Sequence, residues 1–193
     1  MKQTTVKGSN LNIHTLGPEG TNCEAAAANW LAENNINGNI ILHNTLEDGI
    51  VSMQKDPKEA MLLGCVVYPD LHHLVFNNRH KSKLVECFVF PTMPMLLAAR
   101  SNSFKYDIIA THPAPTALIP ENFDERMYVN SNAVAAKKCA DGIVDACITT
   151  EKSAKQHGLI IIEDFGQIPM GFTLHGRMDS DVSSIKSNSL YKA

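Results

Sequence analysis

The chain has 193 residues, of which 44% are hydrophobic, and this is enough for a core that needs neither disulfides nor a structural metal. A net charge of -3 with scattered basic residues argues against nucleic acid or an anionic membrane surface as a partner. No apolar run approaches the roughly 20 residues of a membrane span. The opening MKQTTVKGSN also lacks the apolar segment of a signal peptide.

The cysteines stand singly and are odd in number, which argues against a disulfide framework and favours a reducing, cytoplasmic setting. Cys139 and Cys147 have apolar neighbours, as buried thiols do. The histidine doublet, His72-His73, is predicted to be an exposed turn and not a metal site, because neighbouring side chains of a strand point to opposite faces.

Short apolar runs alternate with helical patterns, which is typical of an α/β fold. In the first half of the chain, strands are predicted at 12–16, 39–42, 62–67, 84–90 and 95–99. One helix is predicted at 25–33, behind a capping box in which Thr21 caps the free amides and Glu24 reaches back. A second helix is predicted to open at Thr45 and to end near Gln54.

In the second half, strands are predicted at 105–110, 126–129, 144–148, 159–162 and 170–174. A short helix or turn is predicted at 112–118, and a helix at 133–140 is capped by Ser131 or Asn132. The helix at 150–157 is predicted to end at Gly158. Residues 1–10 and 179–193 are expected to be mobile tails.

Two strand-to-helix junctions carry groups suited to an anion. Gly17-Pro18-Glu19-Gly20-Thr21, followed by Asn22, places glycines beside a helix N-terminus. Asn130-Ser131-Asn132 before the 133–140 helix repeats the arrangement with hydroxyl and amide groups. Each junction alone is more often a structural turn or a plain N-cap. If both helix starts face one site, they would together hold a small molecule with two carboxylates.

Thr111-His112-Pro113 follows a predicted strand, at the end where α/β sheets place ligand groups. A lone histidine in such a place is more often structural. Imidazole is nevertheless the side chain best suited to move a proton near neutral pH. Glu47-Asp48 and Lys137-Lys138 are interpreted as solvated helix faces.

Four motifs in order resemble those of the prephenate dehydratases. The first motif is residues 15–21 followed by Glu24-Ala25-Ala26, and the second is Thr111-His112-Pro113. The third is Asn130-Ser131-Asn132-Ala133 followed by Ala135-Ala136-Lys137, and the fourth is Gly158-Leu159 followed by Ile162-Glu163-Asp164. The resemblance runs from about 12 to 176 and implies a bilobal, periplasmic-binding-protein-like α/β fold with the substrate in a cleft between two lobes. Lobe one is expected at 11–87 plus 164–178 and lobe two at 88–163, with no ACT-type regulatory domain after them.

The departures from the dehydratases point to a related activity. Met170-Gly171-Phe172 stands where they have Thr-Arg-Phe, the segment around Tyr68 lacks their Glu-Asn pair, and Leu118 replaces their glutamine. The chain is instead similar to the prephenate decarboxylases of bacilysin-type and aeruginosin-type antibiotic and peptide pathways. The segments that carry this similarity are Ile168-Pro169-Met170, His112-Pro113-x-Pro115 and Val129-Asn130-Ser131.

A dehydratase couples loss of carbon dioxide to departure of the ring hydroxyl, which needs a proton donor within hydrogen-bond reach. Met170 and Gly171 offer none, so the resemblance implies that the hydroxyl survives and that a ring carbon is protonated. An apolar pocket of Met170, Phe172 and Leu118 would destabilise the ring carboxylate. The two helix starts would anchor the pyruvyl carboxylate. His112, Tyr68 or a held water could deliver the proton, and the residues do not choose among them.

We therefore expect a lyase of secondary metabolism that decarboxylates prephenate and uses no metal or organic cofactor; the association of related dehydratases suggests a homodimer. The expected substrate contacts are Gly20, Thr21, Asn22, Thr111, Ser131, Asn132, Met170, Gly171 and Phe172. Two alternatives stay open. One is a prephenate dehydratase that makes phenylpyruvate, and the other is a small-molecule binding module without chemistry.

Overall fold

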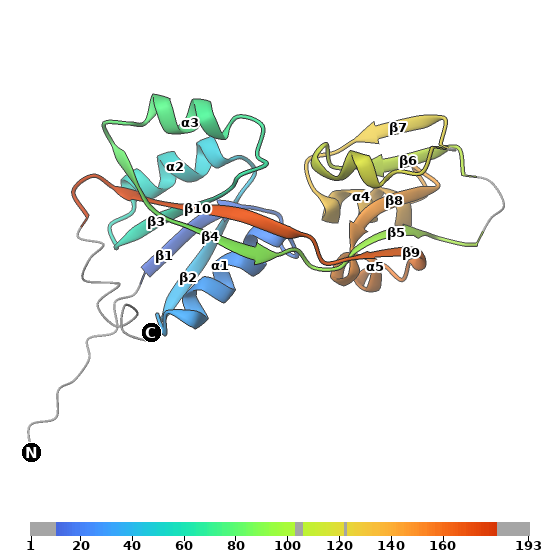
Figure 1. Cartoon of the computed structure of the whole chain (residues 1–193), viewed down its shortest axis with the longest axis horizontal. Helices are drawn as coiled ribbons and strands as arrows, with labels where there is room; N and C mark the ends of the chain where they lie inside the picture. Colours follow the sequence, from blue (N-terminus) through green and yellow to red (C-terminus); the bar gives the residue numbers. More distant parts are fainter. Residues whose placement is uncertain (1–10, 103–105, 122, 181–193) are drawn as a thin grey trace, which may run out of the picture. The chain divides into compact units, whose positions relative to one another are not determined.

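The computed structural model describes residues 11–102, 106–121 and 123–180, which form two compact units (Figure 1). Unit 1 contains the described residues of 1–16, 26–88 and 172–193, and unit 2 contains 17–25 and 89–171. The predicted lobes differ from these units mainly at Gly17–Ala25 and at 164–171, which both belong to unit 2. None of the helices in the described ranges is long and apolar enough to cross a membrane.

Unit 1 is built on a five-stranded sheet with the order β2-β1-β3-β10-β4. Its strands are β1 (Leu11–Leu16), β2 (Gly38–His43), β3 (Ala60–Cys65), β4 (Ser82–Pro91) and β10 (Pro169–Arg177), and its helices are α1 (Asn22–Glu33), α2 (Leu46–Lys55) and α3 (Leu71–Asn77). β1 runs parallel to both β2 and β3, while β10 is antiparallel to β3. The carboxyl ends of the first three strands therefore lie at one edge of the sheet.

Helices cover both faces of the unit 1 sheet, with α2 and α3 on one face and α1 on the other (Figure 1). Leu46, Ile50 and Met53 of α2 pack with Leu62 of β3 and Leu74 of α3 in one buried cluster. The hydroxyl of Thr45 accepts the N–H of Asp48, which confirms the predicted start of α2.

Unit 2 is also built on a five-stranded sheet, with the order β7-β6-β8-β5-β9. Its strands are β5 (Met95–Ala99), β6 (Ile108–Thr111), β7 (Glu125–Tyr128), β8 (Ala146–Thr150) and β9 (Ile160–Gly166), and its helices are the 3-10 helix η1 (Ala114–Leu118), α4 (Asn132–Ala140) and α5 (Glu151–Gln156). β6 runs parallel to β7 and β8, whereas β5 is antiparallel to β8 and β9.

The five residues of β5 are all buried, because this strand has apolar layers on both of its faces. Leu96 and Ala98 pack in the cluster that contains residues of α4 and α5. Met95, Leu97 and Ala99 pack in a second cluster with Ile119 and Phe123. The two predicted core cysteines, Cys139 and Cys147, are buried free thiols of the first cluster.

Each predicted strand overlaps a strand of the described residues, with bounds shifted by a few positions. The strand predicted at 62–67 ends earlier, because Val66 and Val67 are exposed. The exposed turn predicted at His72-His73 is wrong: both side chains are exposed, but they lie on α3, which is held to the core by the buried Leu74. Except for 179–180, the predicted mobile tails lie outside the described residues, as does residue 105 of a predicted strand.

Candidate functional site

The carboxyl ends of β6, β7 and β8 lie at one edge of the unit 2 sheet, because these three strands run in the same direction. The antiparallel β5 begins at the same edge, where Met95 pairs with Thr150. The strands lead into η1, α4 and α5, so three helix starts gather there. Ligands of α/β sheets bind at this kind of edge. We therefore take it as the candidate site.

The start of α4 is held by hydrogen bonds on both sides of Ser131 and Asn132. The buried Ser131 caps the helix, since its Oγ accepts the N–H of Val134 at 3.2 Å. Oγ1 of Thr149 donates to the carbonyl oxygen of Asn132 at 2.7 Å, and Nδ2 of Asn132 lies 3.9 Å from Sδ of Met95. Within the described ranges Oδ1 of Asn132 is buried without a hydrogen-bond partner. The oxygen of this amide therefore has no hydrogen-bond partner among the described residues.

The glycine-rich junction before α1 belongs to the same unit. Gly20 has a φ of +84°, and its N–H donates to Oε2 of Glu24 at 2.5 Å. Oγ1 of Thr21 accepts the N–H of Glu24 at 3.3 Å, so Thr21 and Glu24 cap α1 much as predicted, although Glu24 reaches back to Gly20. A Cβ placed on Gly20 would lie 3.8 Å from Oγ of Ser153 in α5. The junction thus lies beside the first turns of α5.

His112 follows β6 at the candidate edge and is half-buried. Its Nδ1 accepts the N–H of Ala114 at 3.2 Å, so the neutral ring carries its proton on Nε2. Burial lowers the pKa of His112 from its ordinary value, which keeps the ring neutral near pH 7. Thr111 is fully buried and its hydroxyl donates to the carbonyl oxygen of His112 at 2.9 Å. This hydrogen bond fixes the backbone at the end of β6, next to the imidazole of His112.

Tyr68 and Phe172, two of the predicted site residues, lie in unit 1. The phenol of Tyr68 donates to Oε2 of Glu47 at 2.7 Å, and burial together with this carboxylate raises the pKa of Tyr68 to about 12. Phe172 is fully buried and stacks on Phe88 with ring centroids 5.8 Å apart. The other predicted residues all belong to unit 2, with Met170 and Gly171 half-buried at the start of β10.

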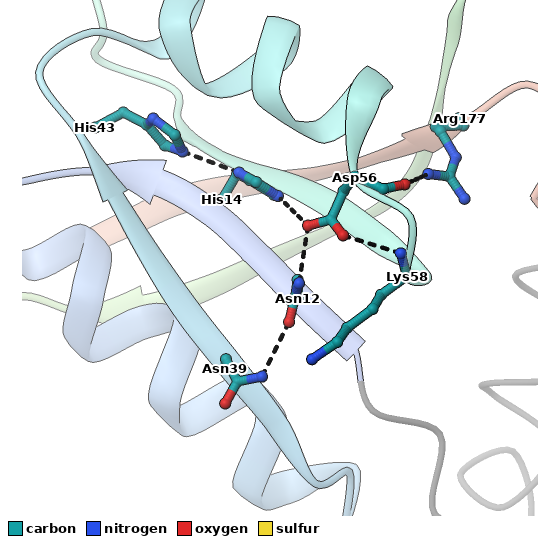
Figure 2. A network of polar contacts seen from close by, with 7 residues as sticks. All are labelled: Asn12, His14, Asn39, His43, Asp56, Lys58 and Arg177. Atoms are coloured by element: carbon teal, nitrogen blue, oxygen red, sulfur yellow. Dashed lines mark hydrogen bonds and ion pairs between the residues drawn. The ribbon is translucent and has the colours of Figure 1, made fainter.

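A second polar cluster, in unit 1, had no counterpart among the predicted site residues (Figure 2). Nε2 of His14 lies 3.0 Å from Oδ2 of Asp56, and Nδ1 of His14 lies 2.9 Å from Nε2 of His43. Asn12 and His14 alternate with Leu11 and Ile13 on a strand that is paired on both sides. Polar residues on such a strand must find partners inside the fold, and this alternation is the signal that could have revealed the cluster.

Further donors surround the Asp56 carboxylate. Nδ2 of Asn12 donates to Oδ2 at 2.8 Å, and the N–H of Lys58 donates to Oδ1 at 2.9 Å. Burial alone would raise the pKa of Asp56, but the hydrogen bonds from Asn12, Lys58 and His14 outweigh it and lower the pKa below its ordinary value. In the described part of the chain, no group of three or more His, Cys, Asp and Glu side chains is arranged to hold a metal ion.

An individual relative, and not a family model, places the chain in a family. No family model matches the chain. A prephenate decarboxylase of Bacillus subtilis (strain 168) is 31% identical to it over 193 residues, which cover 93% of each chain. The chain belongs to the prephenate decarboxylase family. This membership confirms the resemblance predicted from the motifs of the sequence.

Solved structures confirm the predicted α/β, periplasmic-binding-protein-like fold of this prephenate decarboxylase family member. A prephenate dehydratase from Arthrobacter aurescens in complex with L-Phe has a TM-score of 0.65 at 18% identity, and the match covers 88% of this chain and 61% of that one. The periplasmic VFT2 domain of BvgS from Bordetella pertussis has a TM-score of 0.56 at 14% identity, with 96% and 88% covered. At these identities the likeness concerns the fold alone.

Proposed function

We propose that this protein is a carbon-carbon lyase that decarboxylates prephenate and leaves the ring non-aromatic, making a dihydro-4-hydroxyphenylpyruvate. The observation that carries the proposal is the 31% identity to a prephenate decarboxylase along 93% of the chain. The bond between the ring and its carboxylate breaks, carbon dioxide leaves, and the electron pair moves through the diene to a ring carbon that takes up one proton. The ring hydroxyl keeps its C–O bond.

The starts of α1 and α4 are the proposed anchor for the pyruvyl carboxylate. Helix N-termini present unpaired backbone N–H groups and the positive end of the helix dipole, both of which favour an anion. Thr21 and Asn22 stand at the start of α1, where the N–H of Gly20 is bonded to Glu24, and Ser131 and Asn132 stand at the start of α4. The unsatisfied amide of Asn132 supports a ligand there, because rotation of the amide lets it offer either a donor or an acceptor.

We propose that the ring hydroxyl survives because of the residues at the start of β10. Hydroxide is a poor leaving group, so dehydration needs an acid within hydrogen-bond reach of that oxygen. Met170 and Gly171 have no side-chain donor, and Phe172 is fully buried against Phe88. With no acid from this segment, decarboxylation proceeds while the alcohol remains.

Of the two side chains predicted to deliver the proton, His112 has the stronger support. Its lowered pKa makes the protonated ring a stronger acid than an ordinary imidazolium, and its neutral form still offers Nε2–H to a substrate oxygen. Tyr68 is a weak acid by comparison, since its pKa is raised to about 12 and its proton is directed at Glu47.

The setting we propose is the cytoplasm, in a pathway of antibiotic or peptide secondary metabolism. The free cysteines support a reducing compartment. The similarity of the segments around Met170, His112 and Ser131 to bacilysin-type and aeruginosin-type decarboxylases supports the pathway. A homodimer is the proposed assembly, by analogy with related dehydratases.

Incubation of the pure protein with prephenate, followed by proton NMR of the product, tests the function. We expect vinyl ring protons with the hydroxyl-bearing carbon retained, together with release of carbon dioxide. Aromatic protons would instead show that the protein is a dehydratase. Unchanged prephenate together with ligand-induced thermal stabilisation would show a binding module without chemistry.

A further inference from the structure

A short segment of unit 2, residues 93–95, contacts the starts of three helices. Its first methionine donates its N–H to Oδ1 of Asn22, the first residue of α1, at 2.9 Å. The carbonyl oxygen of its proline accepts the N–H of Glu151, the first residue of α5, at 2.9 Å. Sδ of its second methionine lies 3.9 Å from Nδ2 of Asn132, the first residue of α4. All of these residues belong to unit 2, so the three helix starts are gathered within one unit.

Lys152 lies beside this segment, because it directly follows Glu151 in the first turn of α5. A Cβ placed on Gly20 would lie 4.0 Å from Cε of Lys152, so the lysine stem passes close to the turn before α1. The ammonium group is one bond beyond this carbon. The Lys152 side chain is exposed, which gives its ammonium access to a molecule that enters from solvent.

The ammonium of Lys152 has no protein partner in the described part of the chain. No hydrogen bond or ion pair of those residues engages its Nζ. Two neighbouring lysines differ in this respect, since Lys155 pairs with Glu151 and Lys137 pairs with Asp141. The charge of Lys152 is therefore available to an anion.

The other lysines and arginines described in unit 2 lie away from the three helix starts or are already paired. Arg100 follows β5, which runs antiparallel to β8 and so ends at the opposite edge of the sheet. Arg126 is in the amino-terminal half of β7, and Lys137 and Lys138 are in the last turn of α4. Among the described residues of this unit, Lys152 is the lysine or arginine that stands in the first turn of a helix at the candidate edge.

We propose that Lys152 is a substrate-binding residue, whose ammonium pairs with the pyruvyl carboxylate of prephenate beside the starts of α1 and α4. The proposal rests on the proposed decarboxylase function. Prephenate carries two carboxylates, whereas a helix start supplies only about half a positive charge. His112, at the same edge, is neutral near pH 7 and does not supply the missing charge. Lys152 supplies a full one.

The reaction itself indicates which of the two carboxylates is paired. The ring carboxylate loses its charge as carbon dioxide leaves, so a cation beside it would stabilise the substrate more than the transition state and slow the reaction. The pyruvyl carboxylate keeps its charge throughout. An ion pair with that group stabilises substrate and transition state equally, which lowers KM and leaves kcat unchanged.

Decarboxylation kinetics test this assignment. Lys152→Gln should raise KM for prephenate about tenfold, as expected for loss of a charged hydrogen bond, with kcat within about twofold of the wild type. Lys152→Arg keeps the charge and should keep KM within about threefold. The matched control is Lys155→Gln, which makes the same charge change on the same helix and should leave KM unchanged. A lowered kcat with an unchanged KM in Lys152→Gln would overturn the proposal.

Phenylpyruvate is the second probe, because it has the pyruvyl carboxylate and no ring carboxylate. Its binding, measured by isothermal titration calorimetry, should weaken in Lys152→Gln by about the same factor as KM rises. The Kd of the wild type should also increase with ionic strength more steeply than that of the variant, because salt screens the ion pair. Equal affinities of the wild type and Lys152→Gln, or no binding of phenylpyruvate to the wild type, would contradict a pairing with the pyruvyl carboxylate.

The two proposals fail separately. A wild-type protein that releases no carbon dioxide from prephenate contradicts the decarboxylase function, whereas binding of prephenate and phenylpyruvate to the wild type and Lys152→Gln still decides the role of Lys152. An active wild type together with an unchanged KM in Lys152→Gln contradicts the role of Lys152 alone. Because the side chain is exposed and unpaired among the described residues, the variant should fold, and circular dichroism and Tm provide the check.

Discussion

Oδ1 of Asn22 accepts a hydrogen bond from the backbone N–H of Met93 at 2.9 Å, although the two residues are 71 positions apart. Through this bond the first residue of α1 is attached to the segment that leads into β5. The glycine-rich junction owes its place within unit 2 to contacts of this kind, and the junction is half of the proposed anion anchor.

Asn22→Ala should destabilise the protein by about 1–2 kcal/mol, because the Met93 N–H loses its acceptor. It should also raise KM for prephenate, since the start of α1 is no longer attached. Urea denaturation and steady-state kinetics measure the two effects. Asn22→Asp keeps the acceptor and is the control for stability. Equal stability of Asn22→Ala and the wild type would show that this hydrogen bond contributes nothing to the free energy of unfolding.

Substitutions of Ser131 separate helix capping from anion binding. Ser131→Ala removes the cap that accepts the Val134 N–H and should cost about 1 kcal/mol of stability. Ser131→Asp retains a capping oxygen, so its stability should stay near that of the wild type, but its negative charge should repel the substrate carboxylate. We expect KM to rise about tenfold or more in Ser131→Asp, corresponding to about 1.4 kcal/mol. An unchanged KM there would place the carboxylate elsewhere.

The double variant Met170→Thr with Gly171→Arg restores the residue types that the dehydratases have at the start of this strand. If a missing acid is what spares the ring hydroxyl, some phenylpyruvate should form beside the non-aromatic product. Its enol absorbs strongly in alkali, so absorbance of a quenched reaction measures it. Met170→Leu with Gly171→Ala is the matched control and should form none. Equal amounts from both variants would contradict the explanation.

The stability of the fold should decrease as the pH is lowered through the range in which histidines titrate. Burial lowers the pKa values of His43, His112 and His175 below the ordinary 6.5. Below pH 6.5 the unfolded chain therefore binds more protons than the folded one, and the free energy of unfolding falls until the folded-state pKa values are passed. Urea denaturation at about pH 7.5, 6.5 and 5.5 measures this. The decrease should be smaller in His112→Gln.

Gly49→Ala should disturb the packing under α2. A Cβ at this position would lie 2.9 Å from Cδ1 of Leu62, which is fully buried, and 3.5 Å from Cδ2 of His43. Overpacking costs about 1–3 kcal/mol, and the better helix propensity of alanine returns up to about 1 kcal/mol. We expect net destabilisation by thermal denaturation. Val51→Ala, at an exposed position of the same helix, is the control and should change Tm little.

Much of the fold was predictable because its signals are local. The alternation of apolar and polar residues and the caps at Thr45 and Ser131 depend on neighbours a few positions away. The helix α3 escaped prediction, because seven residues with one buried leucine make a weak periodic pattern. The division into units also departed from the predicted lobes, since it depends on contacts such as that of Asn22 with Met93.

The sequence by itself determined the α/β class, the family, and the residues at the starts of α1 and α4, because motifs and caps are read along the chain. Only the tertiary structure decided that the proton of Tyr68 is directed at Glu47, that Phe172 stacks inside the core, and that Asp56 lies against His14. These are pairings between residues far apart in sequence. No local pattern encodes them, because they exist only once parallel strands and the helices above them have packed.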